Sequence, residues 1–218
     1  MNLVASSFAW PFRSGWRSRW AIGVAAVLLL PIAFVPLLGY AVAATRSATA
    51  DPEPGPPPWA ISARLLTDGF WVALALIVIT APFALLVSPL ATVINGAHLW
   101  HVSPATTSQL YAGIAAGFIL ALPWGIVLLL LLPHATERFA ETGRPRDLFD
   151  FAAAVRRVGR DFATWNLCAA AIVTAWALGL ACAGLLCIGV VPGVFYAILV
   201  SAHASAALHH KTADPPAG

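Results

Sequence analysis

Long stretches without any charged residue alternate with short charged ones along this chain. Residues 20–45, 69–136 and 162–210 contain no Asp, Glu, Lys or Arg, and they are 26, 68 and 49 residues long. A helix needs about 20 mainly apolar residues to cross ~30 Å of hydrocarbon, because it rises ~1.5 Å per residue. The two longer stretches must therefore each fold back within themselves.

Polar, glycine and proline residues mark where these two stretches turn. A polar segment from Asn95 to Gln109 interrupts the middle stretch, and Gly-Val-Val-Pro-Gly at 189–193 interrupts the last one. The chain is thus predicted to be all-α, a polytopic helical membrane protein with four spanning helices. The predicted spans are 70–97, 108–132, 165–186 and 190–208.

The first apolar segment, 20–45, is long enough to cross, but Pro31 and Pro36 divide it into arms too short to span. Lys and Arg concentrate in cytoplasmic loops. If this segment dips and returns, all twelve basic residues lie on one side; if it crosses, they split nine against three. The charge distribution favours a re-entrant segment, and full crossing stays open as the alternative.

The segments outside the spans have patterns of their own. Residues 46–69 form a Pro-rich loop, and 209–218 form a polar tail. Residues 147–164 alternate as an amphipathic interfacial helix, with Asp147 as the predicted N-cap and Asp150 three residues later. The apolar face of this helix is predicted to meet lipid. Its other face carries three basic residues, expected to bind anionic lipid headgroups at the cytoplasmic face: Arg156, Arg157 and Arg160.

Composition narrows the class of protein. The chain has 218 residues, of which 60% are hydrophobic and 10% charged, and its net charge is +3. The basic residues form no continuous face, so we expect no nucleic-acid partner. Membrane lipids are the expected partners. A protein partner or a homo-oligomer is also considered. Gly113 with Gly117, and Gly189 with Gly193, have the spacing that lets helices approach closely. This spacing predicts packing within the chain, with homodimerisation as the alternative.

Residues that carry chemistry are sparse. Cys168, Cys182 and Cys187 show no metal-binding spacing, and no phosphate loop or nucleophile motif occurs. The four predicted spans contain no Asp, Glu, Lys or Arg, which argues against an ion-coupled transporter. We therefore expect no catalytic residue, no metal and no cofactor. The remaining candidate is a polar groove formed by three residues: Asn95, His98 and His203.

Short motifs in a characteristic order run along nearly the whole chain. In the first half they are Pro11-Phe12, Trp16, Gly23, Pro31, Gly39-Tyr40, Arg46, Pro58-Trp59 and Asp68-Gly69. In the second half they are 138–143, 148–151, Asn166, Pro192, Tyr196 and Ala202-His203. This order resembles the prokaryotic multi-pass membrane family called domain of unknown function 4013. The resemblance implies a helical integral membrane protein and no particular activity.

Together these patterns lead to a functional expectation. We expect a non-enzymatic integral protein of a prokaryotic plasma membrane that acts as an accessory or interaction subunit or organises the membrane. The alternative is a channel or carrier for a neutral or lipidic substrate.

Overall fold

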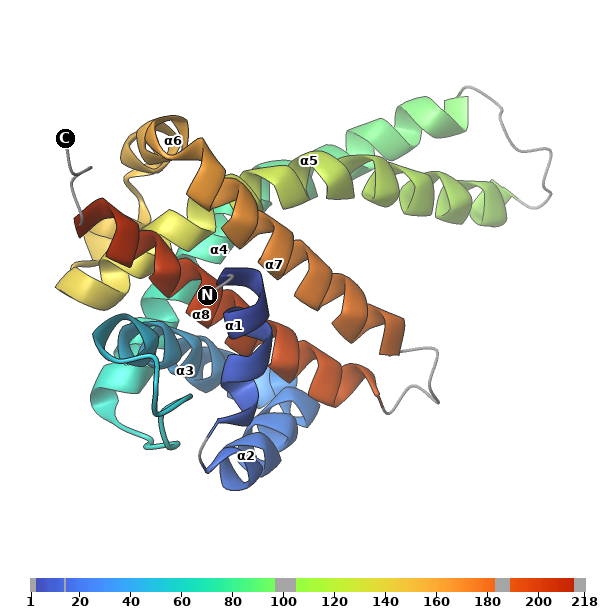
Figure 1. Ribbon diagram of the computed structural model, residues 1–218. Coiled ribbons are helices and arrows are strands. Elements are labelled where there is room, and N and C mark those ends of the chain that lie inside the picture. Colours follow the sequence, from blue (N-terminus) through green and yellow to red (C-terminus); the bar gives the residue numbers. More distant parts are fainter. Residues whose placement is uncertain (1–2, 14, 97–104, 183–188, 214–218) are drawn as a thin grey trace. The chain divides into compact units, whose positions relative to one another are not determined.

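The computed structural model describes residues 3–13, 15–96, 105–182 and 189–213. Over these residues the chain is helical and contains no strand (Figure 1). Five of the described helices are long and apolar enough to cross a membrane. The prediction of an all-α chain with the composition of a membrane protein is therefore confirmed. The chain divides into two compact units, residues 1–73 with 131–218 and residues 74–130.

Four long helices overlap the four predicted spans but differ from them at their ends. They are α4 (Ala63–Gly96), α5 (Ala105–Thr142), α7 (Phe162–Ala181) and α8 (Val190–Ala213). Because α4 begins at Ala63, the predicted loop 46–69 is too long at this end. Because α8 continues to Ala213, the predicted tail begins as helix. In both places a few polar residues extend the helix. Hydropathy locates the apolar part of a helix but does not define the residues at which the helix begins and ends.

The N-terminal region consists of α1 (Leu3–Ala9), a 3-10 turn η1 (Trp10–Phe12), α2 (Trp16–Leu28) and α3 (Leu30–Ala50). The chain breaks at Leu29, just before Pro31, whereas Pro36 lies inside α3. The prediction that both prolines divide the segment is wrong for Pro36. Proline in a membrane helix is tolerated because neighbouring groups satisfy the carbonyl it leaves free.

Helices α2 and α3 form a hairpin whose two ends lie together. The indole N–H of Trp59, in the loop after α3, donates to the carbonyl oxygen of Arg19 at 3.1 Å. The Arg13 guanidinium donates to the carbonyl oxygen of Pro52 at 2.6 Å. At the opposite end, the tip exposes Leu28 and Ile32. A re-entrant segment requires such adjacent ends, whereas α3, with 21 residues, is by itself long enough to cross. The topology therefore stays a prediction.

The core of the first unit lies where α2, α3 and α8 meet. The rings of Tyr40 and Trp59 stack with centroids 3.9 Å apart, and Phe195 of α8 packs against both. Helices α7 and α8 lie side by side in Figure 1 and cross at a glycine pair. A Cβ on Gly179 would lie 2.6 Å from the carbonyl oxygen of Gly193, so only glycine allows this approach.

The second unit contains residues 74–96 of α4 and 105–130 of α5. Ala112 and Ala116 of α5 are buried against Ile94 of α4. In contrast, a Cβ on Gly113 or Gly117 would meet nothing within 4 Å. The Gly113–Gly117 spacing therefore makes no close helix crossing within the described part of this chain.

The predicted helix 147–164 is instead three elements: η2 (Pro145–Leu148), α6 (Phe151–Arg160) and the first turn of α7. Asp150, and not Asp147, is the N-cap of α6, because its carboxylate accepts from the backbone N–H of Ala153 at 3.0 Å. Asp147 is buried and accepts from the Thr142 hydroxyl. The prediction that Asp147 is the N-cap is therefore wrong, because its carboxylate is held by the Thr142 hydroxyl and lies 3.4 Å from Arg138.

Candidate functional site

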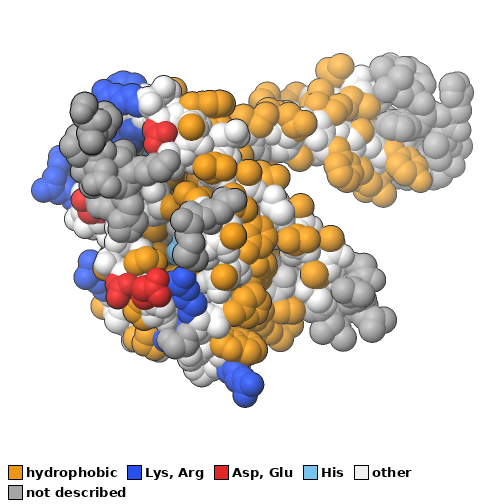
Figure 2. Space-filling model, in the orientation of Figure 1, with side chains coloured by type: hydrophobic (Ala, Val, Ile, Leu, Met, Phe, Trp, Pro, Cys, Tyr) orange, Lys and Arg blue, Asp and Glu red, His pale blue; other side chains and the backbone are white. Residues whose placement is uncertain are grey.

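Charged side chains gather along one edge of the first unit (Figure 2). The Arg157 guanidinium donates to the Glu137 carboxylate at 3.0 Å, and only 2% of the Glu137 side chain is exposed. Arg138 lies 3.4 Å from Asp147 and 3.6 Å from Asp150. These ion pairs tie η2 and α6 to the end of α5, so most of the charges serve to hold the fold.

The surface of α6 combines basic and apolar side chains. Arg156 and Arg160 are exposed, as are Val155 of α6 (49%) and Phe162 at the start of α7 (60%). Arg157 pairs with the buried Glu137, and 33% of its side chain is exposed. A buried carboxylate needs a cationic partner. The binding of headgroups by the three arginines stays a prediction.

The predicted apolar face of α6 is also divided. Val158 and Leu148 are buried in the protein, whereas Val155 and Phe162 are exposed. The periodic pattern predicted one face directed to lipid. Part of that face instead covers the neighbouring helices, and the remaining part lies beside the two exposed arginines.

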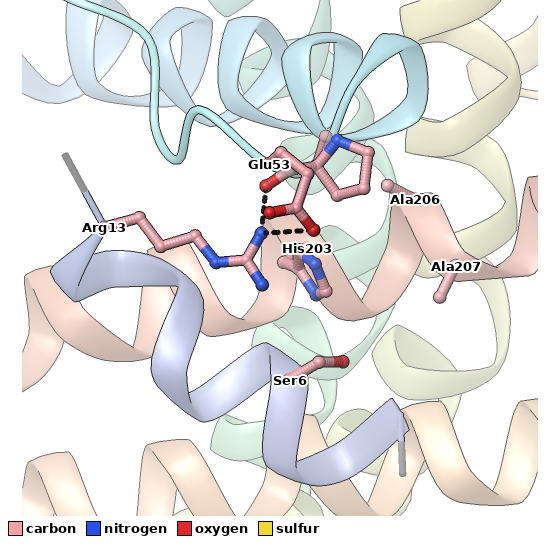
Figure 3. A pocket seen from close by; sticks show the side chains of 8 residues that line it. Ser6, Arg13, Glu53, His203, Ala206 and Ala207 are labelled. Atoms are coloured by element: carbon pink, nitrogen blue, oxygen red, sulfur yellow. Dashed lines mark hydrogen bonds and ion pairs between the residues drawn. The ribbon is translucent and has the colours of Figure 1, made fainter. Parts of the chain in front are cut away.

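A first cavity of about 210 Å³ opens between α1, α8 and the loop after α3 (Figure 3). Arg13, His203 and Glu53 contribute its charged and titratable groups. Glu53 is 84% exposed, and its carboxylate lies 3.5 Å from the Arg13 guanidinium. Arg13 also shares the carbonyl oxygen of Pro52 with the Trp10 indole N–H. This cavity is thus built around a clamp that fastens the Pro-rich loop to the N-terminal turn.

His203 connects the helix α1 to α8. Its Nδ1 lies 2.9 Å from the Ser7 hydroxyl oxygen, which in turn lies 2.9 Å from the carbonyl oxygen of Leu3. His203 is only 7% exposed, so its imidazole serves to dock α1 on α8.

A second cavity of about 170 Å³ lies between α3, the end of the Pro-rich loop and the start of α4. Arg46 lines it, donating through Nη2 to Asp68 at 3.0 Å and through Nε to the carbonyl oxygen of Ala140 at 2.9 Å. Arg64, in the first turn of α4, is exposed at the same cavity. Sequence reasoning missed this site, since Arg46 and Arg64 are separated by a loop whose path the sequence does not define.

Buried polar groups also occur away from these cavities. Both ring nitrogens of His134 and the hydroxyl oxygen of Thr164 are buried without a hydrogen-bond partner in the protein. His134 as a whole is only 5% exposed. Within the described residues, no group of three or more His, Cys, Asp or Glu is placed to hold a metal ion.

Comparison with known proteins defines the family. The model of the family described as protein of unknown function (DUF4013) matches residues 22–201. This chain belongs to the DUF4013 family. No curated protein and no solved structure matches the chain. Membership in DUF4013 confirms the resemblance seen in the sequence and assigns no activity.

In this DUF4013 member the two described residues of the predicted polar groove lie in different units. Asn95 lies in the second unit, where its side-chain oxygen accepts from the Ser108 hydroxyl. His203 lies in the first unit beside Ser7, and its ring centroid is 5.2 Å from that of Trp10. His98 falls outside the described residues. The groove as a joint site of these three residues stays a prediction.

Proposed function

We propose that this chain is a non-enzymatic integral protein of a prokaryotic plasma membrane that acts as an accessory subunit or organises the membrane around it. The observation that carries this proposal is the outer surface of α6, where Arg156, Arg160 and Val155 are exposed, together with exposed Phe162 at the start of α7. A short helix with arginines and apolar side chains on one exposed surface is suited to the interface of an anionic membrane.

The second unit supports the same proposal. Residues 74–130 contain no Asp, Glu, Lys or Arg. Large apolar side chains such as Leu85, Phe118 and Leu122 are between 69% and 76% exposed. Surfaces of this kind require lipid or another apolar helix as their surroundings. The small-residue positions Gly113 and Gly117 lie open beside them.

A lipid-contact measurement tests the interfacial role of α6. A fluorophore is attached at Val155→Cys, in a chain whose native cysteines are replaced by alanine, and brominated phospholipids serve as quenchers in phosphatidylcholine vesicles. We expect strong quenching, increased when phosphatidylglycerol is added. The double variant Arg156→Gln, Arg160→Gln should lose that increase. Quenching no greater than for a label at exposed Glu53→Cys would contradict the proposal.

The accessory role is tested by purifying the full chain from its native membrane and identifying stoichiometric partners by mass spectrometry. Gly113→Ile and Gly117→Ile each place a large side chain on the open surface formed by these two glycines. Phe118→Ile changes an exposed apolar residue elsewhere on the same helix. We expect the two glycine variants to lose a partner that the Phe118 variant retains. A chain that purifies as a monomer without a partner would count against this role.

A second candidate function is a carrier or channel for a neutral or lipidic substrate. It is favoured by the two cavities of the first unit, each of which combines polar and apolar lining residues. These cavities share no lining residue, so transport would require them to join. Partner binding needs no such rearrangement and is therefore the function that we favour.

A further inference from the structure

The cavity between α3 and α4 holds more positive than negative charge. Two arginines and one aspartate line it. The aspartate, Asp68, is engaged by Arg46 at 3.0 Å, and its side chain is only 10% exposed. Within the described part of the chain, no ion pair joins Arg64 to an acid. The Arg64 charge is thus left without compensation at the cavity.

The position of Arg64 in its helix is electrostatically unfavourable when no anion is bound nearby. It lies in the first turn of α4, where the helix dipole disfavours a cation. Ser62, immediately before this helix, accepts from the backbone N–H of Leu65 through its hydroxyl oxygen at 3.2 Å. The hydroxyl proton of Ser62 remains to be donated. An anion in the cavity would compensate the Arg64 charge and accept from these donors.

Arg46 is held in a fixed geometry. Its Nε and Nη2 groups are anchored on the Ala140 carbonyl oxygen and on Asp68. A guanidinium has five N–H donors, so two bonds leave others available. An arginine held in this way loses little conformational freedom when it binds an anion.

The size and depth of the cavity indicate which anion fits. Its volume of about 170 Å³ equals that of only a few water molecules, each of which occupies roughly 30 Å³. The cavity also lies at the beginning of a helix long enough to span the membrane, where lipid phosphates are found. Arginines bind phosphate oxygens in paired hydrogen bonds.

We propose that this cavity is a phosphate-binding site in which Arg64 and Arg46, with the Ser62 hydroxyl, bind a phosphate group carried by an anionic lipid headgroup or by free phosphate. The lipid source rests on the proposed membrane function, and the phosphate chemistry does not. Arg64 is the movable member that closes on the anion, and Arg46 is the fixed member. Tyr40, whose hydroxyl donates to the Pro57 carbonyl oxygen at 2.9 Å, supports the wall of the site.

The experiment measures ligand binding to the detergent-purified full chain by isothermal titration calorimetry. The probes are inorganic phosphate, dihexanoyl phosphatidylglycerol and, as a zwitterionic control, dihexanoyl phosphatidylcholine. We expect one equivalent of phosphatidylglycerol to bind, with about tenfold weaker affinity in Arg64→Gln, because a charge-assisted hydrogen bond is lost. Arg64→Lys should retain part of the affinity, and Arg156→Gln should bind like the wild-type chain.

The outcomes separate the sources of the phosphate. Binding of phosphatidylglycerol alone identifies a lipid site, and binding of inorganic phosphate as well identifies a site for the phosphate group itself. Binding of neither probe, or equal affinities in the wild-type chain and Arg64→Gln, would overturn the proposal. The α6 quenching measurement uses no residue of this cavity, so either proposal can fail while the other holds. Because Arg64 is exposed, its variants should fold normally. Their thermal unfolding midpoints are compared with that of the wild-type chain as a control.

Discussion

Glycines at helix contacts of the first unit differ from those of the second unit. In the first unit a Cβ on Gly39 would lie 1.9 Å from the Leu65 carbonyl oxygen, and one on Gly69 would lie 2.0 Å from the Val35 carbonyl oxygen. In the second unit a Cβ on Gly117 would meet nothing within 4 Å. Gly39 and Gly69 therefore allow helices of the first unit to pack closely, whereas Gly117 is left open to its surroundings.

The two units also differ in the polar contacts that their side chains make. The first unit contains buried ion pairs such as Glu137–Arg157. The second has no ion-pairing residue, and the Trp124 indole N–H donates to the Thr80 hydroxyl oxygen at 3.1 Å. One unit is thus specified by charge and close packing, and the other by hydropathy and a few weak polar contacts.

The largest expected effect concerns the topology of the α2–α3 hairpin. If the α2–α3 hairpin returns to its own side, as we expect, cysteines at Ser18 and Pro54 should both react with an impermeant thiol reagent from the cytoplasmic side and neither from outside. The measurement uses sealed vesicles of both orientations and a chain whose native cysteines are replaced. Labelling of the two positions from opposite sides would show that this segment crosses.

Gly39→Ala should strongly destabilise the first unit. The new methyl group would overlap the Leu65 backbone, which cannot move aside as a side chain can, and we expect a loss of about 3 kcal/mol. Gly117→Ala is the matched control in the second unit and should change stability by less than about 1 kcal/mol, in the stabilising direction. Unfolding in mixed detergent micelles measures both. Equal losses in the two variants would remove the contrast between the units.

Glu137→Gln should have a smaller effect. The substitution keeps the shape of the side chain but leaves Arg157 without its anionic partner, and since Arg157 is partly exposed we expect a loss of about 2 kcal/mol. Glu53→Gln removes a carboxylate that is 84% exposed, and it should leave the unfolding midpoint unchanged. The comparison fails if Glu53→Gln proves as destabilising as Glu137→Gln.

Thr80→Val in the second unit should have the smallest effect. It removes the acceptor of the Trp124 hydrogen bond while keeping the side-chain volume. Polar contacts between membrane helices contribute about 0.6 kcal/mol, so the expected loss is of that size. A loss as large as that of Glu137→Gln would show that the second unit also depends on polar specificity.

The fold was predictable where hydropathy alone decides it. The uncharged stretches located all four long helices, since the length of a span follows from the thickness of hydrocarbon. The break at Leu29 and the continuation of α3 through Pro36 were not predictable, because they depend on the neighbours that satisfy the backbone. Hydropathy therefore gives the spans and leaves their ends and kinks undetermined.

The candidate sites were less predictable than the fold. The exposed positions of Arg156 and Arg160 followed from the periodicity of α6. The inward turn of Arg157 depends on Glu137, which lies 20 residues earlier and on another helix. The cavity at Arg46 and Arg64 depends on the fold of the loop between them. Such sites arise from contacts between segments, which a pattern within one segment does not encode.

The seating of the N-terminal helix sets the order in which the protein can be completed during synthesis. Ser7 bonds to His203, 196 residues later, and the Phe8 carbonyl oxygen accepts from the Tyr196 hydroxyl, 188 residues later. Since α1 is synthesised long before α7 and α8, the helices that it packs against, it stays undocked until both have emerged. A chain interrupted before α7 would therefore leave Val4 and Phe8 of α1 without the side chains that cover them.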